Sequence, residues 1–404
     1  MDQMELANKI SELCLSFYDR LPSAKRSLKS NEWTIYSAIV MESDDRKLEV
    51  VSCGTGTKCI GSMMLSEFGD ILNDSHAEVI CRRAFIRYLL FQIRASKASD
   101  RQSIFQFDEK TMKFKLMNVK FHMFTTSSPC GDASIYSTND NQSENEEPEA
   151  KKVKMSELPN GFTGAKLLFY EDVEDVMAQT EGKIRIKPGK GDRTMSLSCS
   201  DKIARWNMMG IQGCLLSSIV DPIYLNSVIL ADGTSFNQTA MERALYRRFS
   251  DADKFLNHPF KLHRPTILVA NNKLKFPFCR NDTDRVNPSA NSIIYSRIDE
   301  SERPIEVGVS GKRQGVTKKQ MQTRKAHLKI SKIEIFTEYL NILNEFPELK
   351  SHLYSSLINL DDLCYKDVKT STTNDYNLQW RRLKENFLPN WTTKNENLLN
   401  FKSC

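Results

Sequence analysis

Hydrophobic residues recur every three or four positions in several segments, a spacing that predicts amphipathic helices. Leu6, Ile10 and Phe17 follow this pattern with polar residues between them, so residues 4–20 are expected to form a helix. A second helix is expected to begin at the polar run 73–76 and to reach about residue 93, with Asp74 or Ser75 as its N-cap. Further helices are expected at residues 239–250, 331–346 and 375–387.

Short runs rich in Ile, Val, Tyr and Trp alternate with these helices and predict strands. Residues 33–40 and 48–53 are expected to pair, and residues 119–126 form another strand before a short helix that follows Cys130. The segment 201–230 is expected to run as a helix and then a strand. Alternating helices and strands predict an α/β layered fold, with a central mixed sheet flanked by helices in a single large domain spanning residues 1–404.

One stretch lacks large hydrophobic residues altogether. Residues 137–149 are dominated by Asn, Ser, Gln and Glu, so a flexible acidic insertion is expected at about 137–160. The basic run 151–154 within it resembles a nuclear-import patch, although short basic runs are usually just solvated.

Composition is that of a globular protein: the 404 residues are 40% hydrophobic and 27% charged. The formal net charge of +6 is mild, and it indicates nucleic-acid binding only because basic residues cluster at 183–205, 312–332 and 381–394. No run of about eighteen apolar residues occurs, which excludes a helical membrane span, and the first residues do not resemble a signal peptide. Ten cysteines in such a chain are expected to be reduced thiols in an intracellular protein, cytoplasmic or nuclear.

Two short motifs carry the candidate chemistry. His76-Ala-Glu78 at a helix start and Pro129-Cys130 after a strand match parts of the zinc deaminase pattern, H-x-E followed by P-C-x-x-C. Zinc in a catalytic site takes three protein ligands and leaves one position for water, whose pKa it lowers. A carboxylate that is not a ligand then transfers protons, and Glu78 is placed for that role.

The chain departs from this pattern in one place. Ala133 stands where the nearby second cysteine is expected, so the third ligand must come from elsewhere. Cys199, flanked by small polar residues, is the best candidate; Cys214 and Cys53 are weaker because their neighbours are apolar or turn-forming.

Several ordered blocks identify a wider similarity. The blocks lie at 54–59, 73–83, 128–133, 198–207, 210–213 and 221–224. They resemble the adenosine deaminases acting on RNA, and the segments 13–18, 31–34 and 185–194 resemble the branch that acts on transfer RNA. The resemblance implies a cytidine-deaminase-like fold and hydrolysis of adenosine to inosine at position 37 of alanine tRNA, next to the anticodon. It assigns zinc to His76, Cys130 and Cys199, and proton transfer to Glu78.

The resemblance also places residues against the RNA. Thr57 and Lys58 are expected near the ribose and phosphate of the target nucleotide, and Ile35 near its base. Where editors of messenger RNA have an arginine, this chain has Ser134, so that contact is expected to be absent or replaced. From its charge alone, a basic loop beside Cys199 is also expected to contact the anticodon arm, if it is not simply a solvated turn; its residues include Lys183, Arg185, Lys187, Lys190 and Arg193.

Members of this family hold inositol hexakisphosphate inside the fold. The matching residues here are Asn73, Arg82, Arg83, Lys202, Arg205, Lys332, Lys369, Tyr376, Trp391 and Lys394. The paired arginines Arg82 and Arg83 in an apolar helix support burial of charge, which an enclosed anion would compensate. The register near residues 380–383 is ambiguous, because Trp380 or Arg381 stands where a lysine is expected. Lys202 is expected to connect this cage to the metal site through Asp74 and Lys166.

Three other functions compete with a tRNA deaminase. A free-nucleoside deaminase would leave the basic loops without a role. An editor of double-stranded or messenger RNA is disfavoured because this chain has no room for RNA-binding domains before the catalytic blocks. An inactive RNA-binding relative is disfavoured because His76, Glu78, Cys130 and Cys199 are all present.

Overall fold

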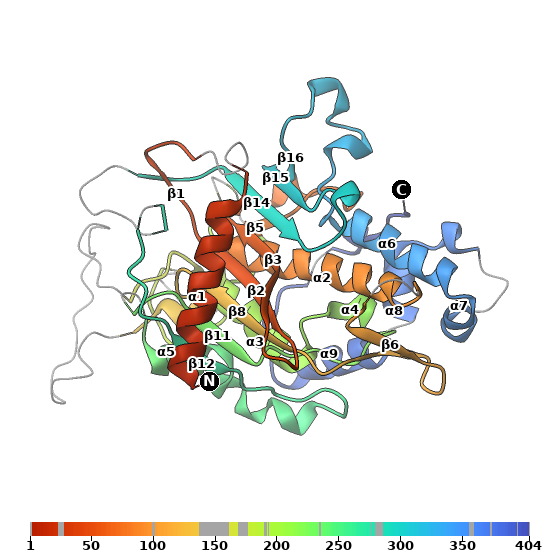
Figure 1. Cartoon of the computed structure of the whole chain (residues 1–404), viewed down its shortest axis with the longest axis horizontal. Coiled ribbons are helices and arrows are strands. Elements are labelled where there is room, and N and C mark those ends of the chain that lie inside the picture. The colour runs from red at the N-terminus through yellow and green to blue at the C-terminus, as the bar shows by residue number, and fades with distance from the viewer. Residues whose placement is uncertain are drawn as a thin grey trace.

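Figure 1 shows the structure of the chain, which is a computed structural model. It describes residues 2–22, 28–98, 102–136, 161–168, 177–189, 192, 194–233, 236–275, 277–278, 286–354, 359–371, 374–393 and 395–403.

A mixed eight-stranded sheet forms the centre of the molecule, with strand order β12-β11-β8-β2-β3-β14-β15-β16. The strands β8, β11 and β12 run parallel to one another, and the remaining neighbours are antiparallel. The bounds are β2 (Tyr36–Glu42), β3 (Leu48–Thr55), β8 (Lys120–Thr125), β11 (Ser227–Leu230), β12 (Thr266–Val269), β14 (Asn291–Ser296), β15 (Ile305–Val309) and β16 (Lys312–Arg313).

Helix α1 (Gln3–Arg20) covers one face of this sheet. The side chain of Asp2 caps the helix by accepting a hydrogen bond from the backbone N–H of Glu5. Ile10 and Cys14 of its apolar stripe are fully buried against the sheet, and Leu6 and Phe17 are partly buried beside them. The prediction of an amphipathic helix at residues 4–20 is confirmed.

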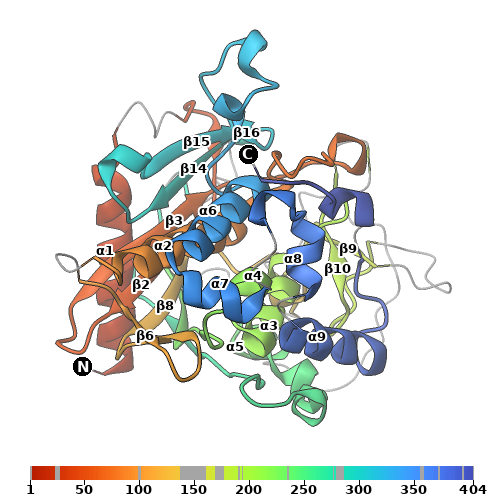
Figure 2. The same ribbon diagram turned by 90° about the vertical axis from the view of Figure 1, so that its right-hand side faces the viewer.

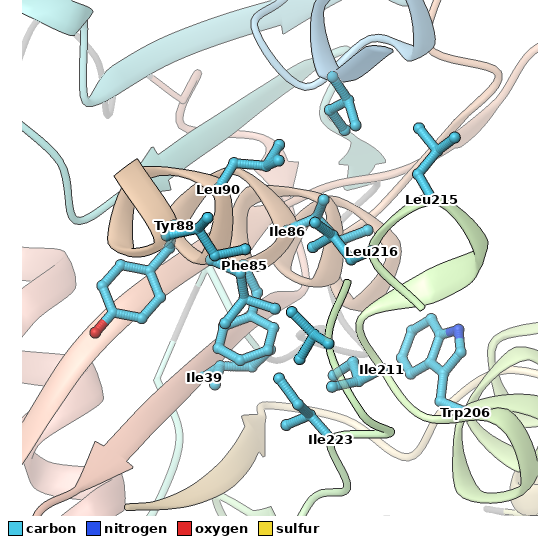
Figure 3. Packing of buried hydrophobic residues seen from close by; sticks show 14 of the residues in the cluster. Ile39, Phe85, Ile86, Tyr88, Leu90, Trp206, Ile211, Leu215, Leu216 and Ile223 are labelled. Carbon is cyan, nitrogen blue, oxygen red and sulfur yellow. The ribbon is translucent and has the colours of Figure 1, made fainter. Parts of the chain in front are cut away.

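Helix α2 (Ala77–Ala95) covers the opposite face and is buried on almost every side. Phe85 and Tyr88 point toward the sheet, while Ile86 meets Leu216 of the neighbouring α4 segment (Figure 3). Because the helix lies between two layers, the residue at its N-terminus is largely shielded from solvent, with a side chain that is 12% exposed. That residue is His76, the N-cap of α2.

The second layer over α2 is built from the remaining helices (Figure 2). These are α3 (Cys199–Met209), α4 (Gly213–Leu216), α5 (Gln238–Leu245), α6 (Lys332–Glu345), α7 (Pro347–Leu353), α8 (Tyr365–Ser371) and α9 (Asn374–Asn386). Short 3₁₀ helices are η1 (Ser62–Met64), η2 (Asp132–Ser134), η3 (Arg247–Phe255), η4 (Glu300–Glu302), η5 (Lys318–Gln320), η6 (Arg324–Ala326), η7 (Leu360–Asp362) and η8 (Glu396–Leu399). Small two-stranded pairs join β1 (Glu32–Trp33) to β13 (Asn287–Pro288), β4 (Thr57–Cys59) to β5 (Asp74–His76), β6 (Phe105–Asp108) to β7 (Lys113–Leu116), and β9 (Lys166–Leu167) to β10 (Arg185–Ile186).

The mixed α/β fold with one large sheet agrees with the sequence prediction. The predicted N-cap of α2 is wrong, because Asp74 and Ser75 lie in strand β5 and His76 is the cap. The acidic insertion predicted at 137–160 lies outside the described residues, with the basic run 151–154 inside it. Among the described residues, none of the helices has the length and apolar character needed to cross a membrane.

Candidate active site

Four side chains predicted from the sequence come together at the N-terminal end of α2. His76 ends strand β5, and Glu78 follows it in the first turn of α2. Cys130 follows strand β8, and Cys199 is the first residue of α3. Strand ends and helix starts from three separate parts of the chain therefore converge on one point.

These side chains contact one another directly. The backbone N–H of Cys199 donates to the sulfur of Cys130 at 3.3 Å, and the Cys199 thiol lies 3.2 Å from Oε2 of Glu78. Within the described ranges, no three His, Cys, Asp or Glu side chains surround a common metal position.

A buried ionic network lies directly behind this group. Asp74 accepts a hydrogen bond from Nδ1 of His76 at 2.9 Å and from the ammonium of Lys187 at 2.7 Å. Lys187 also donates to the sulfur of Cys199 at 3.1 Å, and Lys202 forms an ion pair with the same Asp74. Because Nδ1 of His76 is held by Asp74, its other ring nitrogen is the one available to a ligand.

The pKa values of Cys130, Asp74 and Glu78 are shifted by their surroundings. Hydrogen bonding with Cys199 and the charge of Lys187 hold the pKa of Cys130 well below its usual value, despite burial. Burial opposes the ionised form of Asp74, but the charges of Lys187 and Lys202 keep its pKa well below the usual range. Burial, with the nearby Cys130, raises the pKa of Glu78. The site thus favours a thiolate beside a carboxyl group that holds a proton readily.

One imidazole and two thiols, with a lysine ammonium on one sulfur, form a donor set that suits Zn²⁺. The carboxyl group of Glu78 adjoins these donors without being needed as a ligand. The hydrogen bond from Asp74 orients the imidazole as a metal ligand requires. The alternative cysteine ligands are excluded by position: Cys53 is buried in the core of strand β3, and Cys214 lies at a separate cavity described below.

The two cysteine loops are held by buried charges. Arg243 contacts the carboxylate of Asp132 at 3.2 Å, and Arg248 forms an ion pair with Asp201 at 2.5 Å. Both carboxylates are fully buried. These pairs fix the loop after Cys130 to the first turn of α3, which carries Cys199.

The residues expected to contact the target nucleotide lie beside the site. Thr57 pairs directly with His76 across strands β4 and β5, and the exposed Lys58 follows it. Ile35 is half-buried, and its carbonyl accepts from the N–H of Gly56 at 3.1 Å. The hydroxyl of Thr57 is buried with no hydrogen-bond partner among the described residues, as expected for a group that a substrate would satisfy.

The basic loop requires a correction. Lys187 was predicted from its charge to contact RNA, but its side chain is fully buried. Its ammonium group donates to Asp74 and to Cys199, so it cannot reach an RNA phosphate. Arg185 is also buried and donates to backbone carbonyls. Lys190 and Arg193 lie outside the described residues. Ser134, at the position of the editors' arginine, turns inward and donates to the carbonyl of Pro129 at 3.0 Å.

A cavity of about 430 Å³ lies behind the ionic network. Seven basic residues line it: Arg82, Arg83, Lys202, Arg205, Lys332, Lys369 and Lys384. The one carboxylate in its described lining is Asp74, which Lys187 and Lys202 already engage. Asn73, Tyr376 and Trp391 complete the set predicted from the sequence, while Lys394 lies outside the described residues.

Burial disfavours the charged form of several cations in this cavity. Burial lowers the pKa of Arg82 and of Arg83 to about 10. Burial and neighbouring cations lower the pKa of Lys332 to about 8. The Nε of Arg205 is buried without a hydrogen-bond partner among the described residues. An anion with several charges would satisfy these groups, whose burial is otherwise costly.

Two details of this region differ from the sequence prediction. Lys384 lines the cavity, although the sequence prediction did not include it. Of the two residues considered in its place, Arg381 is exposed, and Trp380 stacks under the guanidinium of Arg205 at 3.9 Å. Lys384 could have been found by counting forward from Tyr376 along α9 in steps of four, which gives Trp380 and then Lys384. The predicted connection from Lys202 to the metal site through Asp74 and Lys166 is wrong in its last member, because Lys166 is exposed on strand β9. Lys187 is the lysine that contacts Asp74 there.

The chain resembles known adenosine deaminases over most of its length. A family model described as the adenosine-deaminase (editase) domain matches residues 52–395. The tRNA-specific adenosine deaminase 1 of Drosophila melanogaster is 38% identical over 401 residues, covering 97% of this chain and 96% of the relative. The Homo sapiens protein of the same name is 29% identical, covering 96% and 98%. The double-stranded RNA-specific editase Adar of Drosophila melanogaster is 35% identical, but the match covers 55% of this chain and 32% of that protein.

These matches confirm the resemblance inferred from the sequence blocks. The chain belongs to the adenosine-deaminase (editase) domain family, a family of hydrolytic deaminases.

Proposed function

We propose that this protein is a zinc-dependent deaminase that converts adenosine to inosine at position 37 of alanine tRNA. The observation that carries the proposal is the convergence of His76, Glu78, Cys130 and Cys199, with an ammonium donating to one sulfur and a carboxylate orienting the imidazole. The whole-length similarity to relatives named as tRNA-specific deaminases favours tRNA over duplex RNA, for which the match covers a smaller share of both chains.

Zinc would be held by His76, Cys130 and Cys199, and when bound it would lower the pKa of a water molecule to near neutrality. Glu78 would take one proton from the attacking water at its carboxylate and give it to the purine ring nitrogen. It would then carry the second proton of that water to the amine, which leaves as ammonia. Its raised pKa suits a group that must both take and give a proton. Asp74 and Lys187 hold the imidazole and the Cys199 sulfur in place.

The substrate must present an adenosine outside its stack, because the site is recessed. A loop nucleotide meets this need at a lower cost than a base-paired one. Thr57, with its unpaired buried hydroxyl, and the exposed Lys58 would contact the ribose and phosphate, and Ile35 would contact the base. The proposal includes a fold of cytidine-deaminase type, and the central mixed sheet with α2 packed on it supports this part of the proposal.

The basic cavity would hold inositol hexakisphosphate. The seven cations that line it match a dense polyanion in charge, and Lys202 connects the cavity to the site through Asp74. This anion would stabilise the packing of α2, α3, α8 and α9 around it, since each of these helices supplies lining residues.

The proposal is tested by inosine formation on an alanine tRNA transcript, on a duplex RNA and on free adenosine, with wild type and Glu78→Ala side by side. Conversion at position 37 by wild type alone supports the reaction, the substrate and the proton shuttle. Conversion of duplex RNA without conversion of tRNA would support an editor of double-stranded RNA. No conversion of any substrate by folded, zinc-loaded wild type would support an inactive RNA-binding relative.

A further inference from the structure

A second feature of the surface is a basic lobe formed by residues 312–329. Between Glu306 and Glu334 the sequence contains no acidic residue. The lysines and arginines in this interval are Lys312, Arg313, Lys318, Lys319, Arg324, Lys325, Lys329 and Lys332. In Figures 1 and 2 the segment that follows β16 projects beyond the edge of the sheet, away from the rest of the chain.

The lobe is folded by specific contacts, so its charges keep fixed positions. Thr317 and Gln320 form a reciprocal capping box. Lys312 pairs with Asp70 at 3.3 Å and donates to the carbonyl of Met321 at 2.6 Å. The side chain of Ala326 is fully buried at its base.

Glu334 anchors the other end of the lobe. Its buried carboxylate accepts from Arg324 at 2.8 Å, from His327 at 3.2 Å and from Lys329 at 2.8 Å. Hydrogen bonds from these three groups hold the pKa of Glu334 well below its usual value against the effect of burial. Three of the positive groups are therefore committed to holding the lobe on α6.

Three other lysines point outward. Lys318, Lys319 and Lys325 are exposed, and none of the ion pairs found among the described residues involves them. Exposed lysines on a rigid projection, without acidic neighbours, form a local positive field that attracts a polyanion. Met321, which is 36% exposed, is the large hydrophobic residue on the surface of the lobe. The described residues of the lobe therefore do not form the cluster of apolar side chains that is typical of the centre of a protein interface.

The base of the lobe is attached to the strand that carries the active site. The backbone N–H of Leu72 donates to the carbonyl of Gly311 at 2.9 Å, and Leu72 lies just before β5 and His76. Gly311 has φ +78°, and a Cβ there would meet the Leu72 carbonyl at 2.5 Å, so the contact requires glycine. The base of the lobe is therefore tied to the chain four residues before His76.

We propose that Lys318, Lys319 and Lys325 bind phosphates of the tRNA substrate outside the nucleotide that is deaminated. The lobe would then orient the folded RNA relative to the active site, since phosphate contacts position a nucleic acid without reading its sequence. This inference rests on the proposed function for the identity of the RNA, but its first test measures binding and not deamination.

The test compares the wild type with the triple variant K318A/K319A/K325A in binding of full-length alanine tRNA, measured by fluorescence anisotropy at several salt concentrations. Three phosphate contacts contribute about 2.7 to the slope of log affinity against log salt. Between about 50 and 200 mM salt, wild type should therefore lose about 40-fold more affinity than the variant. The matched control K47A/K110A/K261A removes three exposed lysines from other turns and should retain most of the wild-type slope.

A second measurement separates binding from chemistry. The triple variant should raise KM for full-length tRNA and leave kcat unchanged, while a short anticodon stem-loop that does not reach the lobe should show little change in either. Equal salt slopes and equal affinities for wild type and the triple variant would overturn the inference. A wild type that binds tRNA through the lobe but forms no inosine would overturn the proposed function instead and leave the lobe's role intact.

Discussion

Replacing Lys187 with methionine distinguishes two roles for this residue. Either it is a buried lysine that stabilises the site, or it is a lysine that contacts RNA, as its charge suggests. The ammonium group has no solvent exposure and donates to Asp74 at 2.7 Å and to Cys199 at 3.1 Å. Methionine keeps the length and apolar stem of the side chain but removes both hydrogen bonds and the charge.

The expected loss follows from these two contacts. Each hydrogen bond that involves a charged group contributes about 1.5–3 kcal/mol, so two give about 3–6 kcal/mol. Removing one partner of a buried ion pair independently costs about 3–5 kcal/mol. Lys202 and His76 still contact Asp74, which limits the damage. We therefore expect the free energy of unfolding to fall by about 3 kcal/mol or more.

Urea unfolding of the purified protein in the absence of RNA measures this value. Lys183→Met is the matched control, because Lys183 lies in the same basic segment with an exposed side chain and should change the unfolding free energy by less than about 0.5 kcal/mol. If Lys187→Met unfolds at the same urea concentration as wild type and loses only tRNA affinity, the buried assignment is wrong and the lysine contacts RNA.

Three further substitutions probe the proton shuttle, the cysteine loop and the cavity. Glu78→Gln should reduce inosine formation by a factor of about 10² to 10⁴ while zinc content, measured by atomic emission, stays at the wild-type value. Gly131→Ala should lower the free energy of unfolding by about 2 kcal/mol or more, since the residue has φ +103° and a Cβ would lie 2.2 Å from the hydroxyl of Ser198. Thermal unfolding measures this, with Gly164→Ala as the control because a Cβ at Gly164 meets nothing within 4 Å. In protein stripped of its polyanion, the pKa of Lys332 is about 8, whereas it is about 10.5 in the unfolded chain. Between these two pH values the unfolded state binds more protons than the folded state, so the free energy of unfolding should rise with pH. Lys332→Met should remove part of that rise in urea unfolding at pH 8 to 10, and an unchanged pH dependence would contradict the assignment.

The sequence predicts the elements of the fold well where hydrophobic spacing is decisive. Helix α1 and helix α6 lie within a residue or two of the predicted ranges because each has one apolar stripe. The N-cap of α2 was not predictable in the same way. Asp74 is a good capping residue by type, but its carboxylate is taken by partners at positions 187 and 202, which only the tertiary structure brings to it.

The same limit applies to the site. Residues that contact their chain neighbours or follow a motif, such as His76 and Glu78, could be found from the sequence. The role of Lys187 could not, because a lysine in a basic segment looks the same in the sequence whether it is buried or exposed. Its burial follows from strand β10, which carries it toward Asp74 and the first turn of α3.

The central claim is that two cysteines and one histidine hold a zinc ion next to Glu78. X-ray absorption at the zinc edge of the purified protein tests it most directly. The account predicts one zinc per chain with two sulfur ligands at about 2.3 Å and one imidazole nitrogen at about 2.0 Å. It further predicts that one sulfur ligand is lost in Cys199→Ser. A spectrum without sulfur ligands, or one unchanged by Cys199→Ser, would contradict it.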